Sequence, residues 1–274
     1  MSIKFDGRKI QKEILAKVKK RLEKIDYQPT LAVIWVGNDP ISARYVAIKQ
    51  RIAEDLGIHF DIYKYPSDVK IEALISKIKE LNLEKKVDGI MIQMPLPSRV
   101  DSIKIISEID PKKDVDGLRM CADLVCEIRP PVIKSVLMAI KSSGVDIRKS
   151  KVAIVGKGFL VGAPLIKILQ QLALELNVAD IETPYIGTMT ADADIVISAT
   201  GKAGLITSDI VKDGVVIVDA GTSEVGGELR GDVDPEVYKK ASHYTPVPGG
   251  IGPVTVAMLF DNLLDIIEAK HEKK

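Results

Sequence analysis

The sequence is poor in several residues and patterns that define large classes of protein. It has only two cysteines, Cys121 and Cys126, so neither a disulfide framework nor a zinc site is indicated and reduced thiols are expected. The formal net charge is +1, which provides no basic excess for nucleic acid or an anionic membrane. No apolar run approaches the ~20 residues that span a bilayer. Residues 1–8 lack the apolar core of a signal peptide, so we expect a soluble cytoplasmic protein.

What the chain does contain is a regular alternation of strand and helix patterns. At 274 residues it is longer than a typical single domain and suits two. An amphipathic helix over residues 10–22 comes first, because its apolar positions fall on one helical face. The next pattern predicts strands over 31–36, 58–65 and 87–92, separated by helices over 42–56 and 69–83. This β-α-β-α-β order predicts a parallel sheet with helices on its faces.

A second series is organised around the stretch from Lys151 to Gln170. An apolar run at 152–155 is followed by Gly156, Gly158 and Gly162, and then by apolar residues at helical spacing. In a strand, tight turn and helix, Gly156 lets the chain turn, Gly158 lets backbone approach a pyrophosphate, and Gly162 lets helix and strand pack closely. Three glycines at this spacing also occur in ordinary turns without a ligand.

The first three strands that follow this loop end in small residues. Strands are predicted over 174–178, 194–199, 215–219 and, more briefly, 243–247. Small residues at these ends leave room for a flat cofactor across the sheet edge. We therefore expect a dinucleotide-binding Rossmann-type domain over 131–252, inserted into a first domain of residues 1–130 plus 253–274, with a cleft between the two. Pro253 starts the last helix, whose apolar stripe is expected to pack on the first domain.

Three side chains of the first domain are candidates for one ligand-facing edge. Tyr45 and Lys49 are four residues apart, so a helix places them on one face near the end of the preceding strand. Gln93 follows the third strand directly and begins a proline-stiffened loop. The alternatives are a surface tyrosine packed on a lysine stem and a glutamine that caps loose backbone amides.

An acidic turn occupies residues 110–117 and contains Asp110, Asp114 and Asp116. Its spacing does not match a calcium loop, because the further oxygen ligands and the closing glutamate are missing. We favour a single carboxylate presented to a ligand, with an ordinary loop as the alternative.

Five segments in this order resemble the bifunctional methylenetetrahydrofolate dehydrogenase/methenyltetrahydrofolate cyclohydrolase (FolD) family over nearly the whole chain. They are Tyr45 to Lys49, the loop at Gln93, the Asp-Val-Asp-Gly turn at 114–117, the glycine loop at 156–164 and the Pro-Val-Pro-Gly-Gly-Ile-Gly-Pro-Val-Thr segment at 246–255. The last is the most specific. The resemblance implies oxidation of 5,10-methylenetetrahydrofolate with NADP, hydrolysis of the methenyl product to 10-formyltetrahydrofolate, no metal, and a cytoplasmic homodimer. It also implies a place in one-carbon metabolism that serves purine, methionine and histidine biosynthesis.

The resemblance also assigns roles to residues. Lys49 would be the acid and base of hydrolysis, Gln93 would hold its amine by a hydrogen bond, and Tyr45 would lie against the folate ring. Asp116 would accept hydrogen bonds from the pterin, and Pro248, Gly249 and Gly250 would line the folate site through backbone. The implied cofactor-binding residues are Gly156, Lys157, Gly158, Gly162, Ala199, Thr200, Gly201, Gly221, Thr222 and Thr255.

The chain departs from the family pattern in three places. It has Pro131-Val132-Ile133 where Cys-Thr-Pro is usual, a shortened segment at 119–127, and Thr222-Ser223 where an isoleucine-asparagine pair is common. The cofactor's ribose site has two candidates. In the family a basic residue after the first glycine often meets the 2′-phosphate, so Lys157 favours NADP. Asp180 is placed to hold a ribose hydroxyl, which favours NAD, and the alternative is that it caps a helix or turn. We expect NADP, the commoner cofactor of the family.

Two other interpretations share part of this pattern. A shikimate-type dehydrogenase would have the glycine loop and the two-domain layout, but it gives no reason for the segment at 246–255. A non-enzymatic dinucleotide sensor would need only the second domain, and it leaves Tyr45, Lys49 and Gln93 without a role.

Overall fold

The computed structural model describes residues 2–272 and forms two compact α/β units. The first unit comprises Glu13–Pro131 and the C-terminal stretch from Val256. The second comprises Val132–Thr255 and the N-terminal stretch up to Lys12, which the sequence analysis had assigned to the first domain. Each unit has its own parallel sheet, so the two-domain α/β fold is confirmed.

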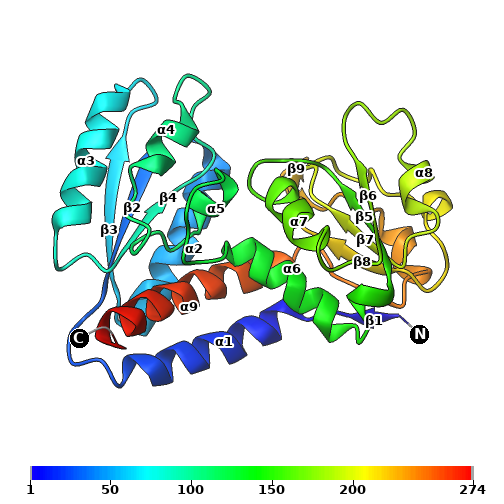
Figure 1. Ribbon diagram of the computed structural model, residues 1–274, viewed down its shortest axis with the longest axis horizontal. Helices are drawn as coiled ribbons and strands as arrows, with labels where there is room; N and C mark the ends of the chain where they lie inside the picture. Colours follow the sequence, from blue (N-terminus) through cyan, green and yellow to red (C-terminus); the bar gives the residue numbers. More distant parts are fainter. Residues whose placement is uncertain (1, 273–274) are drawn as a thin grey trace. The chain divides into compact units, whose positions relative to one another are not determined.

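The first unit is built on three parallel strands in the order β3-β2-β4. They are β2 (Thr30–Val36), β3 (His59–Tyr65) and β4 (Gly89–Ile92). The central β2 is buried on both faces, which explains its continuous apolar run. Helix α2 (Pro40–Leu56) connects β2 to β3, and α3 (Ile71–Leu83) returns from β3 to β4. Because right-handed crossovers in opposite directions put helices on opposite faces, α2 and α3 cover the two sides of the sheet (Figure 1).

The ends of α2 follow from local sequence. Asp39 is its N-cap and accepts a hydrogen bond from Ser42 N at 2.7 Å, and Pro40 occupies the first turn. The helix stops at Gly57, whose φ of 73° is left-handed. These signals fix the start of the helix directly after β2, so Tyr45 and Lys49 lie on its second and third turns.

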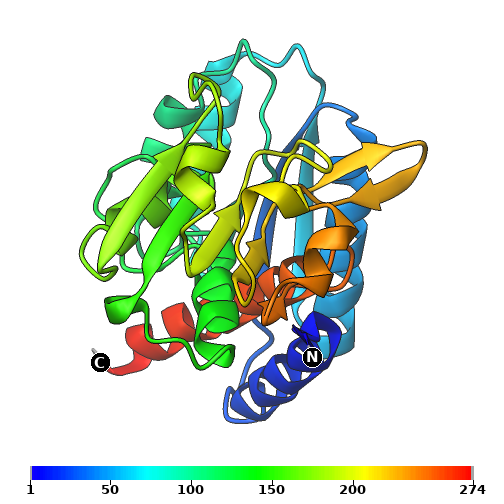
Figure 2. The same ribbon diagram turned by 90° about the vertical axis from the view of Figure 1, so that its right-hand side faces the viewer.

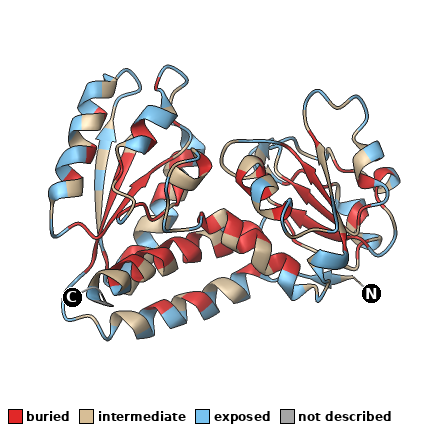
Figure 3. Ribbon diagram, viewed as in Figure 1, coloured by how far each residue is buried: buried red, intermediate tan, exposed pale blue. Residues whose placement is uncertain are grey.

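Helix α9 (Ile251–Glu272) completes the core of the first unit. A Cβ added at Gly89 would come within 2.8 Å of Leu263 Cδ1, which shows how closely α9 packs against the start of β4. Arg21, near the end of α1 (Gly7–Leu22), forms ion pairs of 2.7–2.8 Å with Asp261, Asp265 and Glu268 on α9. In this unit the buried positions concentrate on β2, β4 and α9 (Figure 3). Two short helices, α4 (Ser102–Ser107) and α5 (Leu118–Cys121), complete the unit.

The second unit has a six-stranded parallel sheet in the order β1-β11-β8-β7-β5-β6. The chain leaves β5 toward β6 on one side and returns to β7 on the other, so the strand order reverses at β5, where doubly wound sheets bind dinucleotides. The strands are β1 (Ile3–Lys4), β5 (Lys151–Val155), β6 (Glu175–Ala179), β7 (Ile195–Ser198), β8 (Val216–Asp219) and β11 (His243–Tyr244). The helices are α6 (Pro131–Ser142), α7 (Gly162–Leu169) and α8 (Gly187–Thr190), with 3-10 turns at Ile147–Lys149, Ser208–Ile210 and Pro235–Lys239.

Two features of the second unit were not predicted. The N-terminal strand β1 pairs with β11 at the edge of the sheet. Strands β9 (Ser223–Val225) and β10 (Glu228–Arg230) form an antiparallel ribbon that stands away from the six-stranded sheet (Figure 2). Both elements are two or three residues long, too short to show a period.

Candidate active site

The structure brings Lys49 and Gln93 together in the first unit. Lys49 Nζ donates to Gln93 Oε1 at 3.1 Å and to Met91 Sδ at 3.3 Å. Met91 and Gln93 are two residues apart at the end of β4, so their side chains extend from the same face of the strand. Gln93 is 7% exposed, and its backbone N–H donates to Ile34 O at 2.8 Å, which continues the pairing with β2.

The amide of Gln93 has one orientation that satisfies its neighbours. Gln93 Nε2 donates to Met94 O at 2.7 Å, so Oε1 is the atom left to accept from Lys49. Tyr45 is half-buried and lies one turn before Lys49 on α2. The helix face and the strand end that the sequence analysis singled out therefore meet at a single amine.

The electrostatic environment of Lys49 favours a neutral amine. Burial lowers the pKa of Lys49 below its usual value, and the negative charge of Asp116 opposes this shift in part. Burial also raises the pKa of Asp116, and Lys49 opposes that shift. A lysine that deprotonates more readily than usual is better suited to take up a proton and return it.

Asp114 and Asp116 occupy different environments in the acidic turn. Asp114 is fully buried, and its two carboxylate oxygens accept from Leu118 N at 3.1 Å and Arg119 N at 2.9 Å. Burial raises the pKa of Asp114 to about 6, against the effect of these hydrogen bonds. Asp114 thus closes the turn onto α5, whereas Asp116 is the carboxylate whose charge acts on Lys49.

Asn262 on α9 ties this turn to the core of the first unit. Its Nδ2 donates to Val115 O at 2.8 Å and to Arg129 O at 3.1 Å, and the residue is 0% exposed. Val115 lies between the two aspartates, so the hydrogen bond fixes the backbone that carries Asp116. Neither the aspartates nor the apolar stripe of the last helix indicated this polar contact in advance.

We expect Asn262→Leu, which keeps the side-chain volume, to lower the free energy of unfolding by about 1–3 kcal/mol. The buried carbonyl of Val115 would lose its donor while staying out of water, and the part-buried carbonyl of Arg129 would lose its donor as well. Urea denaturation followed by circular dichroism measures the change. Asn177→Ala is the control, because Asn177 Nδ2 donates to the exposed carboxylate of Glu175 at 3.1 Å, and we expect a change below about 0.5 kcal/mol. An Asn262→Leu protein as stable as the parent would contradict this account.

In the second unit, the loop between β5 and α7 has the geometry that its glycines predict. Gly156 has a φ of 105°, and a Cβ there would lie 2.7 Å from Ala199 O. A Cβ on Gly162 would overlap the carbonyl of Gly156, so this glycine lets α7 start directly beside the turn. At Gly158, by contrast, the nearest atom to an added Cβ is 3.8 Å away. Its lack of a side chain therefore leaves space that the protein itself does not fill.

The other proposed cofactor-binding residues also lie in the second unit. Ala199, Thr200 and Gly201 follow β7, while Gly221 and Thr222 follow β8. Because β5, β7 and β8 are parallel neighbours, these loops and the glycine loop emerge at the same sheet edge. Thr255 is in the first turns of α9, where its hydroxyl bonds to Ile251 O at 3.0 Å and Ser135 Oγ at 3.3 Å.

The segment Pro248–Gly250 follows β11 and is likewise part of the second unit. Gly249 has a φ of 103°, and its carbonyl accepts from Gly7 N at 3.0 Å. A Cβ on Gly250 would come within 2.5 Å of Pro246 O. The tight path of this segment explains its glycines without reference to a ligand, and it presents backbone rather than side chains.

The two candidates for the ribose site form an ion pair with each other. Lys157 Nζ lies 2.7 Å from Asp180 Oδ2, and both side chains are accessible to solvent. The contact raises the pKa of Lys157 and lowers that of Asp180, mainly through their hydrogen bond. Asp180 Oδ1 also accepts from Glu182 N at 3.0 Å. The two side chains, which the sequence presents as rivals, are thus direct neighbours.

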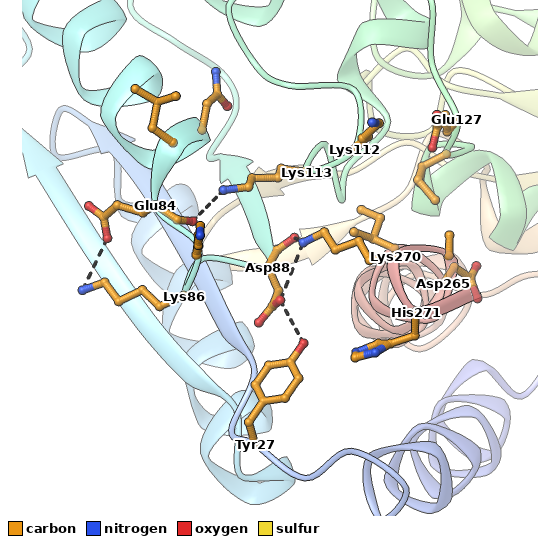
Figure 4. Close-up of a pocket in the computed structure, with 16 residues that line it drawn as sticks. Tyr27, Glu84, Lys86, Asp88, Lys112, Lys113, Glu127, Asp265, Lys270 and His271 are labelled. Carbon is orange, nitrogen blue, oxygen red and sulfur yellow. Dashed lines mark hydrogen bonds and ion pairs between the residues drawn. The ribbon is translucent and has the colours of Figure 1, made fainter. Parts of the chain in front are cut away.

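A cavity of about 1020 Å³ lies elsewhere in the first unit (Figure 4). It includes Asp88, which precedes β4, whereas Gln93 follows β4, so this cavity is at the opposite end of the strand from Lys49. Asp88 accepts from Tyr27 Oη at 3.1 Å and pairs with Lys270 Nζ at 3.6 Å. Lys86 pairs with Glu84 at 3.4 Å. The charged groups Asp88, Lys270, Lys86 and Glu84 of this cavity are therefore paired within the protein.

Residues 2–272 contain neither a metal-binding cluster nor a membrane-spanning helix. No group of three His, Cys, Asp or Glu residues in that range is arranged to hold a metal ion. None of the described helices combines the length and apolar character needed to cross a bilayer.

Comparison with known proteins gave matches over the whole described fold. The family model for the tetrahydrofolate dehydrogenase/cyclohydrolase catalytic domain matches residues 5–116, and the model for its NAD(P)-binding domain matches residues 130–271. The bifunctional protein FolD of Aquifex aeolicus is 41% identical, over 98% of this chain and 97% of that protein. FolD of Lactobacillus acidophilus is 36% identical, over 98% of this chain and 99% of that protein.

Solved structures agree with these sequence matches. The bifunctional FolD enzyme of Campylobacter jejuni superposes with a TM-score of 0.91 at 32% identity, covering 98% of this chain and 100% of that one. A FolD structure from Trypanosoma brucei, complexed with NADP and an inhibitor, gives 0.90 at 30% identity, covering 98% of each chain. A shikimate 5-dehydrogenase of Listeria monocytogenes gives 0.54 at 14% identity over 91% of this chain and 98% of that one, a likeness of fold alone.

Proposed function

The chain belongs to the tetrahydrofolate dehydrogenase/cyclohydrolase family, and we propose on this basis that it carries out both reactions, with Lys49 as the proton-transferring group of the second. It would oxidise 5,10-methylenetetrahydrofolate with NADP and hydrolyse the methenyl product to 10-formyltetrahydrofolate. The observation that carries the proposal is the placement of the Lys49 amine, 3.1 Å from Gln93 Oε1 and under the influence of Asp116.

The oxidation step asks for alignment rather than for a strong base. Lone pairs on the adjacent folate nitrogens assist the loss of hydride from the methylene carbon, and the bound dinucleotide supplies the hydride acceptor. The glycine loop fits such a group, because Gly158 leaves unfilled space beside a tight backbone turn. In this proposal Gly156, Lys157, Gly158, Gly162, Ala199, Thr200, Gly201, Gly221, Thr222 and Thr255 hold the dinucleotide, and no metal takes part.

The hydrolysis step needs a proton acceptor that can also donate. Water attacks the methenyl carbon and gives a proton to the neutral Lys49 amine. The resulting ammonium then returns a proton to the departing ring nitrogen as the carbon–nitrogen bond breaks. The hydroxyl group of the intermediate gives its remaining proton to the Lys49 amine, which passes it to water, as the formyl group forms. Gln93 fixes the amine by accepting one of its hydrogens. Tyr45 lies against the folate ring, Asp116 accepts from the pterin donors, and Pro248, Gly249 and Gly250 contribute backbone contacts.

A spectroscopic assay of methenyl formation tests this function. We expect methylenetetrahydrofolate with NADP to give the methenyl absorbance, which then decays as the formyl product accumulates. Failure to form methenyltetrahydrofolate with either NADP or NAD would refute the proposal. Dinucleotide reduction with shikimate in place of the folate would support a shikimate-type dehydrogenase.

The preference for NADP is tested at the ion pair between Lys157 and Asp180. In Asp180→Asn, Lys157 loses its charged partner and the carboxylate that would repel a 2′-phosphate is gone. We expect the ratio of kcat/KM for NADP to kcat/KM for NAD to rise about fivefold, the scale of an exposed charge interaction. Lys157→Met should move the ratio the other way. Glu175→Gln is the control and should leave the ratio unchanged, because Glu175 is at the start of β6 and its charge acts on Lys151. A parent enzyme that prefers NAD would overturn the assignment to NADP.

We further propose that the enzyme acts in the cytoplasm as a homodimer and supplies one-carbon units to purine, methionine and histidine biosynthesis. The support for this is the family resemblance. Light scattering coupled to gel filtration measures the oligomeric state, and a monomeric mass at micromolar concentration would contradict the dimer.

A further inference from the structure

Two fully buried carboxyl groups, Asp219 and Asp232, lie side by side in the second unit. Asp219 is the last residue of β8, and Asp232 follows β10 by two residues; both are 0% exposed. A Cβ added at Gly221 would overlap the carboxyl of Asp232, and one added at Gly231 would overlap that of Asp219. Each carboxyl therefore packs on a glycine from the other's segment, and the two glycines make room for the pair.

The hydrogen bonds of this pair lead to the loops after β7 and β8. Asp232 Oδ2 accepts from Thr200 N at 2.7 Å and from Ser198 Oγ at 2.8 Å. Asp219 Oδ1 accepts from Gly221 N at 3.0 Å, while its Oδ2 accepts from Val233 N at 3.0 Å. Thr200 and Gly221 are proposed cofactor-binding residues. The two carboxylates therefore bind the backbone of both cofactor loops.

Two carboxyl groups buried side by side are energetically unfavourable, and close packing alone does not account for them. A buried carboxylate costs several kcal/mol unless hydrogen bonds or an opposite charge compensate it. Asp232 Oδ1 is buried and has no hydrogen-bond partner among the described residues. Asp232 raises the pKa of Asp219, and Asp219 in turn raises the pKa of Tyr238 on the 3-10 turn Pro235–Lys239. None of these groups is a cation.

We propose that Asp219 and Asp232 are positioning residues for the dinucleotide, which fix the loops after β7 and β8 and make cofactor affinity depend on a proton held by the carboxyl pair. The inference rests on the proposed function, because it takes these loops to be cofactor loops. It concerns residues outside the set that the sequence indicated, and it assigns them no contact with the cofactor itself.

The titration of the pair supports this inference. Burial and the neighbouring Asp232 raise the pKa of Asp219 to about 7. Burial and the charge of Asp219 raise the pKa of Tyr238 to about 12, so the tyrosine stays neutral near pH 7. Since the raised pKa belongs to an acid, the proton is present below about pH 7 and is lost as the pH rises. Above that pH two buried negative charges repel each other beneath loops that must bind an anionic cofactor.

Calorimetric titration of NADP and NAD between pH 6.0 and 8.5 tests the inference. We expect the parent's Kd for both dinucleotides to rise across pH 7; NAD serves as the reference because it has no 2′-phosphate to titrate. Asp232→Ala, which removes the contacts to Thr200 and Ser198, should raise Kd at least tenfold at every pH. Asp232→Asn keeps an oxygen for Thr200 N but removes the charge, so it should bind within about threefold of the parent at pH 7 and show a flat pH profile.

Two controls separate positioning from folding. Asp234→Asn alters a cap of the neighbouring 3-10 turn, where Asp234 Oδ1 accepts from Glu236 N at 2.8 Å, and it should leave Kd unchanged. Hydrolysis of added methenyltetrahydrofolate, which depends on Lys49 in the first unit, should persist in Asp232→Ala. A parent Kd that is flat with pH, or an Asp232→Ala protein that loses both activities equally at unchanged Kd, would overturn the inference while leaving the proposed function in place. A parent that binds neither dinucleotide and forms no methenyl product would overturn both.

Discussion

We expect Lys49→Met to reduce the hydrolysis of methenyltetrahydrofolate by at least 100-fold while leaving measurable hydride transfer. Methionine keeps much of the length and the apolar stem of lysine, so the packing against Met91 should survive. What is lost is the only proposed proton acceptor, and general acid–base catalysis contributes about 10²–10⁴-fold to rate. Decay of the methenyl absorbance measures the hydrolysis, and its formation from methylenetetrahydrofolate with NADP measures the oxidation.

The pH dependence of the parent enzyme gives a second measure of Lys49. The neutral amine is the base, so hydrolysis should rise with pH as Lys49 loses its proton. Burial lowers the pKa of Lys49, so this rise should fall below the ordinary lysine range. Lys104→Met, at an exposed position of α4, is the control and should retain both activities. Hydrolysis that is undiminished in Lys49→Met would remove this residue from the mechanism.

We expect Gly162→Ala to have the opposite effect to Lys49→Met: it should reduce the dehydrogenase activity and spare the hydrolysis. The new Cβ would overlap the carbonyl of Gly156, so α7 and the turn after β5 must move apart. We expect dehydrogenase activity to fall about 100-fold, the scale of a misplacement of about 1 Å in a reacting site. The free energy of unfolding should fall by about 1–3 kcal/mol because of overpacking. Hydrolysis of added methenyltetrahydrofolate should remain, since Lys49 lies in the other unit.

Gly158→Ala distinguishes a distorted glycine loop from a loop that keeps its structure but no longer admits the cofactor. With the nearest atom 3.8 Å from its Cβ, this alanine fits the protein without strain and should leave the melting temperature unchanged. If a pyrophosphate passes close to Gly158, cofactor affinity should nevertheless fall. Thermal denaturation and cofactor titration of both variants measure the difference. A Gly162→Ala enzyme with parental dehydrogenase activity would contradict the account of the loop, and a Gly158→Ala enzyme with parental cofactor affinity would contradict the close approach.

The sequence predicted the parts of this fold that depend on local pattern. Alternating apolar strands and amphipathic helices identify both parallel sheets, and the carboxyl ends of parallel strands indicate where ligand-facing residues gather. That rule led to Gln93 and Lys49 from separate segments, and the observed distance of 3.1 Å joins them. It also located the glycine turn, because a left-handed residue and a close helix start both require glycine.

What the sequence did not predict depends on pairing between distant segments. Strand β1 has only two residues. Ile3 of this strand pairs with His243 of β11, which is 240 positions further along the chain. Asp219 ends a predicted strand, but Asp232 lies in an irregular segment without any period, so the pairing of the two carboxyls was not apparent. Asn262 interrupts the apolar stripe of α9. Its role, a hydrogen bond to Val115 O, is visible only in the folded unit.

The position of α9 has a consequence for the order in which the chain can fold during synthesis. Residues of α9 that cover the start of β4 and pair with Arg21 follow residues 132–255 in the chain, whereas the three strands they complete precede those residues. The sheet of the first unit therefore keeps apolar surface uncovered while residues 132–255 of the second unit are translated. A nascent chain stopped after Thr255 would hold every strand of both parallel sheets and still lack the part of α9 that closes the first core.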